Sequence, residues 1–136
     1  MRVLVTGASS LLGYRTALAL LKRGHQVVGT YLTHEVPIQH EAFTAVRLDV
    51  RDGASVERLF EEHRPDAVIH MAAYGDVDGC ERDRELAWDV NVLGTINVVK
   101  AAERHAGYLL YLSTDYVFDG RRGMNEEHEP PCPINY

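Results

Sequence analysis

Short apolar runs alternate along the chain with longer amphipathic segments, and this alternation predicts the order of the elements. The short runs are rich in Val, Leu and Ile, as expected of buried strands. The predicted strands are Arg2–Thr6, Gln26–Tyr31, Ala45–Leu48, Ala67–Met71 and Tyr108–Leu112. Apolar residues at helical spacing predict helices over Leu11–Arg23, Ala54–His63 and Glu81–Arg104. The polar segment Thr33–Ala42 and the Pro-rich tail from Arg121 are predicted as loops.

The predicted strands are almost continuously apolar, which is typical of a parallel sheet covered on both faces. Strands that alternate with helices indicate an α/β protein. Right-handed crossovers then predict a doubly wound parallel sheet with strand order 3-2-1-4-5. The chain has 136 residues, a suitable length for one domain, so we treat residues 1–136 as a single unit.

Charge and composition narrow the classes of partner. The chain has 14 Lys and Arg against 20 Asp and Glu, a net charge of −6. This balance argues against nucleic acid as a partner, because a duplex binder needs a basic face. No apolar run reaches the length of a membrane span, and no leader-like segment follows Met1. We therefore expect no membrane partner and a cytoplasmic location.

The potential metal ligands and thiols do not form a recognisable site. Cys80 and Cys132 lack metal-ligand spacing, so two free thiols are expected, with a disulfide or a reactive thiol as the alternative. An acidic cluster is interpreted as a solvated loop and helix start, with no metal predicted. Its members are Asp76, Asp78, Glu81 and Asp83.

A glycine-containing turn, Thr6–Gly13, joins the first predicted strand to the first helix. Gly7 permits a tight turn, and Gly13 lets the helix pack closely on the sheet. Backbone amides at the helix start then point at an anion. This context predicts an NAD(P)-binding Rossmann fold, with a purely structural turn as the alternative. The residues predicted to bind the pyrophosphate are Gly7, Ser9, Ser10, Leu11, Leu12 and Gly13.

Two positions bear on how the dinucleotide is held. Ser10 occupies the place where a middle Gly would let the backbone approach the pyrophosphate, and a Ser fits there if its φ is negative. Its hydroxyl is then able to hydrogen-bond a phosphate. Thr30 and Tyr31, at the end of the second strand, are expected near the ribose, and no carboxylate follows before Glu35. The neutral strand end favours NADP, and NAD stays open.

Six strings in order resemble the extended short-chain dehydrogenase/reductase superfamily, and specifically its dTDP-4-dehydrorhamnose reductase branch. The string Ser113–Gly120, STDYVFDG, is the most specific to that branch. The others are Thr6-Gly7…Gly13, Leu48-Asp49-Val50, His70–Tyr74, Val77–Glu81 and Asn91–Thr95. The resemblance runs from Met1 to Tyr136.

The resemblance implies cofactor contacts along the sheet edge. Asp49 and Val50 would lie against the adenine, and Ala72, Ala73 and Tyr74 would line the path towards the nicotinamide. Structural alternatives stay open, in which Asp49 caps a strand end and Tyr74 is a packing aromatic.

The resemblance also implies catalytic and substrate contacts. Asn91 looks like the helix-kinking Asn that supports the proton relay of the superfamily, and we count it with the cofactor site. Thr114 matches the hydroxyl residue of the catalytic Ser/Thr-Tyr-Lys set, and Thr114 and Asp115 would contact the sugar-nucleotide substrate. The alternatives are an ordinary polar helix residue for Asn91 and a β-branched strand-end residue for Thr114.

The implied reaction is hydride transfer from a nicotinamide to the 4-keto group of a nucleotide-linked sugar, with a Tyr as proton donor. The Tyr-x-x-x-Lys pair is not found. Pro133–Tyr136 places the Tyr just past the last residue, with Tyr136 itself as the alternative. The sequence therefore resembles the N-terminal, cofactor-binding part of a longer reductase. We predict that residues 1–136 alone are inactive and that one sheet face lacks a covering helix, which leaves an apolar patch.

Two other functions remain open. The same branch includes proteins similar to the regulatory subunit of methionine adenosyltransferase, which bind a dinucleotide without catalysis. A sugar-nucleotide epimerase or dehydratase shares the first motif. A nucleotide sugar is the expected substrate, and a homodimer is a further possible assembly.

Overall fold

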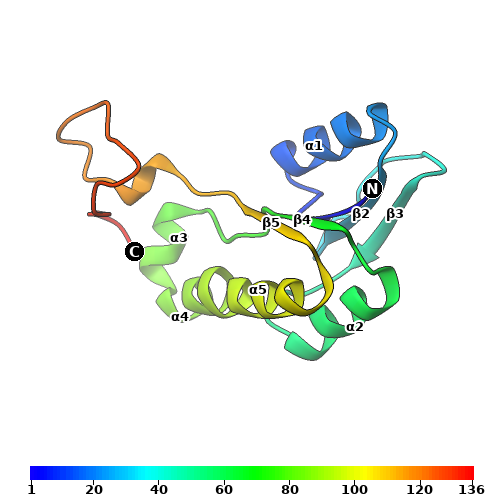
Figure 1. The fold of residues 1–136 in the computed structure, drawn as a ribbon. Coiled ribbons are helices and arrows are strands. Elements are labelled where there is room, and N and C mark those ends of the chain that lie inside the picture. Colours follow the sequence, from blue (N-terminus) through cyan, green and yellow to red (C-terminus); the bar gives the residue numbers. More distant parts are fainter.

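A computed structural model describes residues 1–136 and places five parallel strands in one sheet. The strands are β1 (Arg2–Thr6), β2 (Gln26–Tyr31), β3 (Phe43–Arg47), β4 (Ala67–His70) and β5 (Tyr108–Tyr111). Their order across the sheet is β3-β2-β1-β4-β5 (Figure 1). In register, Val3 of β1 pairs with Val27 on one side and with Ala67 on the other. The predicted doubly wound fold and strand order are confirmed.

The connections between the strands are mostly helical. The helices are α1 (Leu11–Lys22), α2 (Gly53–His63), α3 (Val77–Arg82), α4 (Arg84–Trp88) and α5 (Gly94–His105). A π-helical turn, η1 (Asp89–Leu93), joins α4 to α5, and a short 3-10 turn, η2 (Asp115–Val117), follows β5. None of these helices is both long enough and apolar enough to cross a membrane.

The prediction of one long helix over Glu81–Arg104 is wrong. The chain breaks at Asp83, whose carboxylate accepts a hydrogen bond from the Leu86 N–H (2.9 Å) and starts a new helix there. The π-helical turn then adds an extra residue and rotates the face that follows. In the helix that follows, Ile96 is exposed and Val98 is buried. The other predicted element boundaries agree to within two residues.

Apolar side chains on the two faces of the sheet form two separate core clusters. Helix α1 lies on one side of the sheet, and α2 and α5 lie on the other (Figure 1). On the α1 side, strand residues of β1 and β2 pack on Ala17 and Leu21. On the other side, Leu4 and Val68 pack with Phe60 of α2 and Val98 of α5. The alternation along each central strand therefore fills both cores, which explains the continuous apolar runs.

Strand β5 is the exception to this burial. All four of its residues are exposed, although their sequence is apolar. Tyr108 is 75% exposed and Leu110 is 53% exposed. Both pair with β4 residues on the α1 side of the sheet, and α1 itself covers only β1 and β2 (Figure 1). An exposed apolar patch is present, as predicted, but it lies at the β5 edge, and helices cover the rest of both sheet faces.

Candidate dinucleotide-binding site

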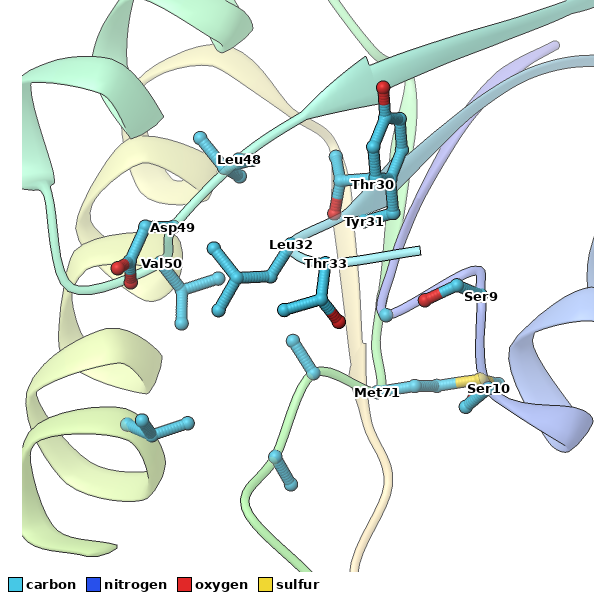
Figure 2. A pocket seen from close by; sticks show the side chains of 14 residues that line it. Ser9, Ser10, Thr30, Tyr31, Leu32, Thr33, Leu48, Asp49, Val50 and Met71 are labelled. Atoms are coloured by element: carbon cyan, nitrogen blue, oxygen red, sulfur yellow. The ribbon is translucent and has the colours of Figure 1, made fainter. Parts of the chain in front are cut away.

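A cleft of about 240 Å³ opens at the carboxyl ends of β1, β2 and β4. This edge of an open parallel sheet is where ligands of doubly wound proteins bind. Figure 2 shows Asp49 on one side of the cleft, Ser9 and Ser10 on the other, and Leu32 and Val50 between them. Its walls include these predicted residues: Gly7, Ser9, Ser10, Thr30, Tyr31, Asp49, Val50, Ala72 and Ala73. It is also lined by residues for which no site role was predicted: Leu32, Thr33, Leu48, Met71 and Val90.

The turn between β1 and α1 requires both of its glycines. Gly7 has a φ of +68°, and a Cβ there would lie 2.9 Å from the Cα of Ala72. A Cβ on Gly13 would collide with the Gly7 carbonyl and would lie 2.8 Å from the Cα of Ala8. The helix start is thus pressed against the turn, and not directly against the sheet as the sequence suggested for Gly13.

The first turn of α1 offers free backbone donors. Ser10 is the N-cap with a φ of −71°, so the negative φ that a Ser requires at this position is present. Its Oγ accepts from the Gly13 N–H (3.0 Å), and its own N–H donates to the Gly7 carbonyl (3.0 Å). The N–H groups of Leu11 and Leu12 have no acceptor within the protein. These two amides, at the positive end of the helix dipole, therefore fit an anion such as a pyrophosphate.

Helix α5 holds the loop that follows β3. The Asn97 side chain donates to the Val50 carbonyl (3.0 Å), and a Cβ on Gly94 would lie 2.6 Å from a methyl group of Val50. Asp49 accepts from the Arg51 guanidinium (2.6 Å) and backbone N–H (3.0 Å), and these hydrogen bonds lower the pKa of its carboxyl. Asp49 thus lines the cleft and also caps its own loop, so the two interpretations of this residue are compatible.

A second hollow of about 390 Å³ continues from the first, because Met71, Ala72 and Ala73 line both. Tyr74, Asn91, Thr114 and Tyr136 are among its other lining residues. Most of the sequence-predicted residues therefore come together along one continuous groove.

The hydroxyl of Thr114 begins the turn η2 at the far end of this groove. It accepts from the Tyr116 N–H (3.3 Å) and donates to the Asp115 carboxylate (3.2 Å). Asp115 lines neither hollow, and the same is true of Leu11, Leu12 and Gly13.

Asn91 lies in the π-helical turn and binds the main chain of Tyr74. Its Oδ1 accepts from the Tyr74 N–H (2.7 Å), and its Nδ2 donates to the Tyr74 carbonyl (3.0 Å). The helix is irregular at this Asn, as the resemblance implies. Because the side-chain amide is engaged by Tyr74, its visible role is to hold the groove wall.

Three residues of the motif strings, for which no role was predicted, form a buried polar chain beneath this wall: Thr6, His70 and Thr95. His70 is fully buried, and its ring nitrogens contact the hydroxyls of Thr6 (2.6 Å) and Thr95 (3.0 Å). Burial lowers the pKa of His70 to about 4, so the ring is neutral at physiological pH. The available signal was a polar residue at the end of the otherwise apolar strand Ala67–His70.

Comparison with known proteins assigns the family. Residues 1–136 match the family described as RmlD substrate binding domain. The chain belongs to this family. Relatives named dTDP-4-dehydrorhamnose reductase agree with the resemblance identified from the motifs.

Three curated relatives of this chain carry names of different functions. A probable low-salt glycan biosynthesis reductase of Haloferax volcanii is 38% identical over 135 residues, with 98% of this chain and 44% of the relative covered. The dTDP-4-dehydrorhamnose reductase of Streptomyces griseus is 37% identical, with 96% of this chain and 38% of the relative covered. The methionine adenosyltransferase 2 subunit beta of Xenopus laevis is 34% identical, with 98% and 38% covered. The chain therefore spans less than half the length of each of these relatives.

Solved structures confirm the family fold. A hypothetical dTDP-4-dehydrorhamnose reductase from Sulfolobus tokodaii superposes with a TM-score of 0.87 at 36% identity, covering 99% of this chain and 47% of that one. The UDP-glucose 4-epimerase of Thermus thermophilus, in complex with NAD, superposes with a TM-score of 0.86 at 35% identity. The superposition covers 99% of this chain and 45% of the epimerase.

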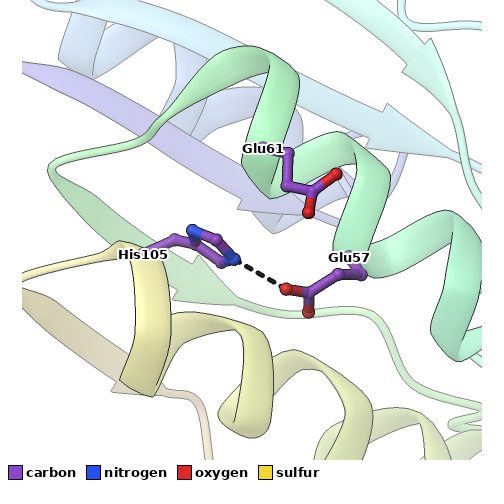
Figure 3. A group of neighbouring side chains, drawn as sticks. All are labelled: Glu57, Glu61 and His105. Atoms are coloured by element: carbon purple, nitrogen blue, oxygen red, sulfur yellow. Dashed lines mark hydrogen bonds and ion pairs between the residues drawn. The ribbon is translucent and has the colours of Figure 1, made fainter.

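One further cluster of potential ligands lies away from the groove of this RmlD-family chain. Glu57 and Glu61 on α2 approach His105 at the end of α5 (Figure 3). Glu57 accepts from His105 (2.7 Å) and is ion-paired with Arg104, and these contacts lower its pKa to about 2. Because both Glu57 oxygens are engaged, the cluster is best described as an ion-pair network that joins α2 to α5.

Proposed function

We propose that this chain is the dinucleotide-binding part of an NAD(P)H-dependent reductase that acts on a 4-keto nucleotide sugar. The single observation that carries the proposal is the continuous groove from Ser9 and Ser10, just before the free amides of Leu11 and Leu12, to Thr114. A groove with an anion-binding helix start at one end and a hydroxyl at the other suits a dinucleotide that meets its substrate at Thr114. The relatives named as reductases support the reaction class.

The residues have distinct tasks along the groove. The Leu11 and Leu12 amides would bind the pyrophosphate, Val50 would pack on the adenine, and the main chain at Ala72 and Ala73 would line the path of the nicotinamide. The bound coenzyme supplies a hydride. Thr114 would exchange its hydrogen bond to Asp115 for one to the substrate carbonyl oxygen, where negative charge develops during reduction.

The ribose end of the groove favours NADP over NAD. Strand β2 ends in Thr30 and Tyr31, and the next residues in the wall, Leu32 and Thr33, are also uncharged. Arg47 donates from Nε to the Leu32 carbonyl (3.1 Å), which brings positive charge close to this end. Comparison of the Kd values for NADPH and NADH tests the preference, and tighter binding of NADH would contradict it.

The function is tested by turnover in the intact protein with a dTDP-4-keto-6-deoxy sugar and NADPH. Thr114→Val keeps the side-chain shape and removes the hydroxyl, so kcat should fall roughly 10²-fold. Thr114→Ser retains a hydroxyl and should keep most of the activity. A Thr114→Val enzyme as active as the wild type would contradict the role of Thr114.

A non-catalytic regulatory role is the second candidate. The identity to the methionine adenosyltransferase 2 subunit beta favours it, as does Ser10, whose hydroxyl is used inside the helix cap. Turnover by the intact protein without any partner would exclude it. An epimerase, the third candidate, returns its substrate to the same oxidation level, so net NADPH consumption separates a reductase from an epimerase.

A further inference from the structure

The buried His70 ring connects two walls of the groove that come from distant parts of the sequence. Its Nδ1 lies 2.6 Å from the Thr6 hydroxyl at the end of β1, and its Nε2 lies 3.0 Å from the Thr95 hydroxyl in α5. The Tyr111 ring of β5 packs at a centroid distance of 5.8 Å. No charged side chain is hydrogen-bonded to His70, so the two hydroxyls are its only polar partners.

The directions of these hydrogen bonds follow from the hydroxyl of Thr6. The Thr6 oxygen accepts from two backbone N–H groups, those of Met71 (3.0 Å) and Ala72 (3.1 Å), which use both of its lone pairs. Its own proton is therefore donated to His70 Nδ1. A neutral ring that accepts at Nδ1 carries its proton on Nε2 and donates it to Thr95.

The chain of hydrogen bonds continues into the π-helical turn. The Thr95 hydroxyl, having accepted from His70, donates to the Asn91 carbonyl (2.7 Å). The Asn91 side chain in turn holds both the N–H and the carbonyl of Tyr74. One continuous chain of hydrogen bonds thus runs from Thr6 to Asn91. At one end Thr6 binds the main chain of Met71 and Ala72, and at the other Asn91 binds that of Tyr74.

We propose that His70, as the neutral Nε2–H tautomer, is a positioning residue that fixes the main chain of residues 71–74 for dinucleotide binding. The inference rests on the proposed function, because residues 71–74 matter in this way only if the groove holds a dinucleotide. Reversal of either hydrogen bond of the ring would leave a buried donor or acceptor without a partner. The ring therefore fixes β1 relative to the turn that carries Asn91.

The tautomer is tested by ¹⁵N NMR of the imidazole nitrogens in the intact protein. The Nδ1 resonance of His70 should have the shift of an unprotonated nitrogen, and Nε2 that of a protonated nitrogen, at neutral pH. A protonated Nδ1, alone or with a protonated Nε2, would overturn the proposal. This readout does not depend on any ligand, so it stands apart from the proposed function.

The positioning role is tested by Thr95→Val, which removes the acceptor for His70 with little change of shape. The Kd for NADPH should rise about tenfold, the effect of losing one buried hydrogen bond. Thr95→Ser keeps the hydroxyl, so its Kd for NADPH should stay near the wild-type value. Val68→Ala is the matched control, because Val68 is buried on the same strand and lies outside the polar chain. It should lower Tm and leave the Kd near the wild-type value.

The outcomes separate the two proposals. An unchanged Kd in Thr95→Val, or an equal rise in Thr95→Val and Val68→Ala, would overturn the role of His70. Failure of the wild-type protein to bind NADPH at all would instead overturn the proposed function, with the tautomer still to be decided by the spectrum.

Discussion

The two glycines of the β1–α1 turn are packed so closely that a side chain at either would displace backbone. Gly7 is also held at a positive φ, which L-residues rarely adopt. Both glycines were predictable from the sequence, because a glycine turn between a strand and a helix has a known geometry. The contact of Gly7 with Ala72 was not, because it joins residues far apart in the chain.

Gly13→Ala should destabilise the protein by about 1–3 kcal/mol, since the new methyl group meets the Gly7 carbonyl and the Cα of Ala8. Chemical denaturation measures the change in the free energy of unfolding. Gly75→Ala is the control, because nothing lies within 4 Å of a Cβ at Gly75. Equal stability of the two variants would contradict the close packing of Gly13.

The buried His70 should make the stability depend on pH in a defined window. Its pKa is about 4 in the folded chain, against 6.5 for a free histidine side chain, so the unfolded chain binds the proton more readily. The stabilisation from the neutral ring is complete above pH 6.5 and is lost as the pH falls towards 4, by up to about 3 kcal/mol. Compared with His70→Gln, the wild type should lose stability more steeply over this window. Parallel stability curves for the two proteins would contradict the lowered pKa. The stability that Glu57 contributes is lost between about pH 4.5 and 2, so it overlaps only the acid end of this window and is common to both proteins.

At the scale of elements, the segment from η1 into α5 organises the groove. Asn91, Thr95 and Asn97 lie on this one segment and bind the main chain of Tyr74, the ring of His70 and the carbonyl of Val50. The central strands β1, β2 and β4 were predicted nearly to the residue because burial on both faces leaves a continuous apolar run. The segment itself was predicted as a regular helix, because periodicity in one sequence does not reveal a π-helical insertion.

Asn91→Ala and Asn97→Ala should weaken ligand binding at different ends of the groove. Asn97→Ala frees the Val50 loop and should weaken binding of AMP, a probe of the adenine end alone. Asn91→Ala frees Tyr74 and should leave AMP binding intact while weakening NADPH. Each loss should be about 1 kcal/mol, or roughly fivefold in Kd, by calorimetric titration. Equal effects of both variants on AMP would contradict this division of the groove.

At the scale of the whole molecule, strand order followed from the alternation of elements and the handedness of crossovers. An uncovered apolar patch was expected on one sheet face, but its place at β5 was not. The exact patch, formed by Tyr108, Leu110 and Leu112, depends on which face α1 covers. All three are exposed apolar residues. The position of Thr114 at the end of the groove also depends on this tertiary arrangement.

The patch predicts that residues 1–136, prepared alone, bind a hydrophobic dye and self-associate with rising concentration. Leu110→Ser should reduce both effects. Met124→Ser is the control, because Met124 is still more exposed but lies in the tail, away from β5. Equal dye binding by wild type and Leu110→Ser, or a larger effect of Met124→Ser, would contradict the assignment of the patch.

A structure of the intact protein with NADPH tests the central claim most directly, namely that this groove holds a dinucleotide. The pyrophosphate oxygens should lie within hydrogen-bond distance of the Leu11 and Leu12 N–H groups. The adenine should pack against Val50, and the nicotinamide should lie beside Thr114. A dinucleotide bound elsewhere, or with its pyrophosphate away from the start of α1, would contradict the account.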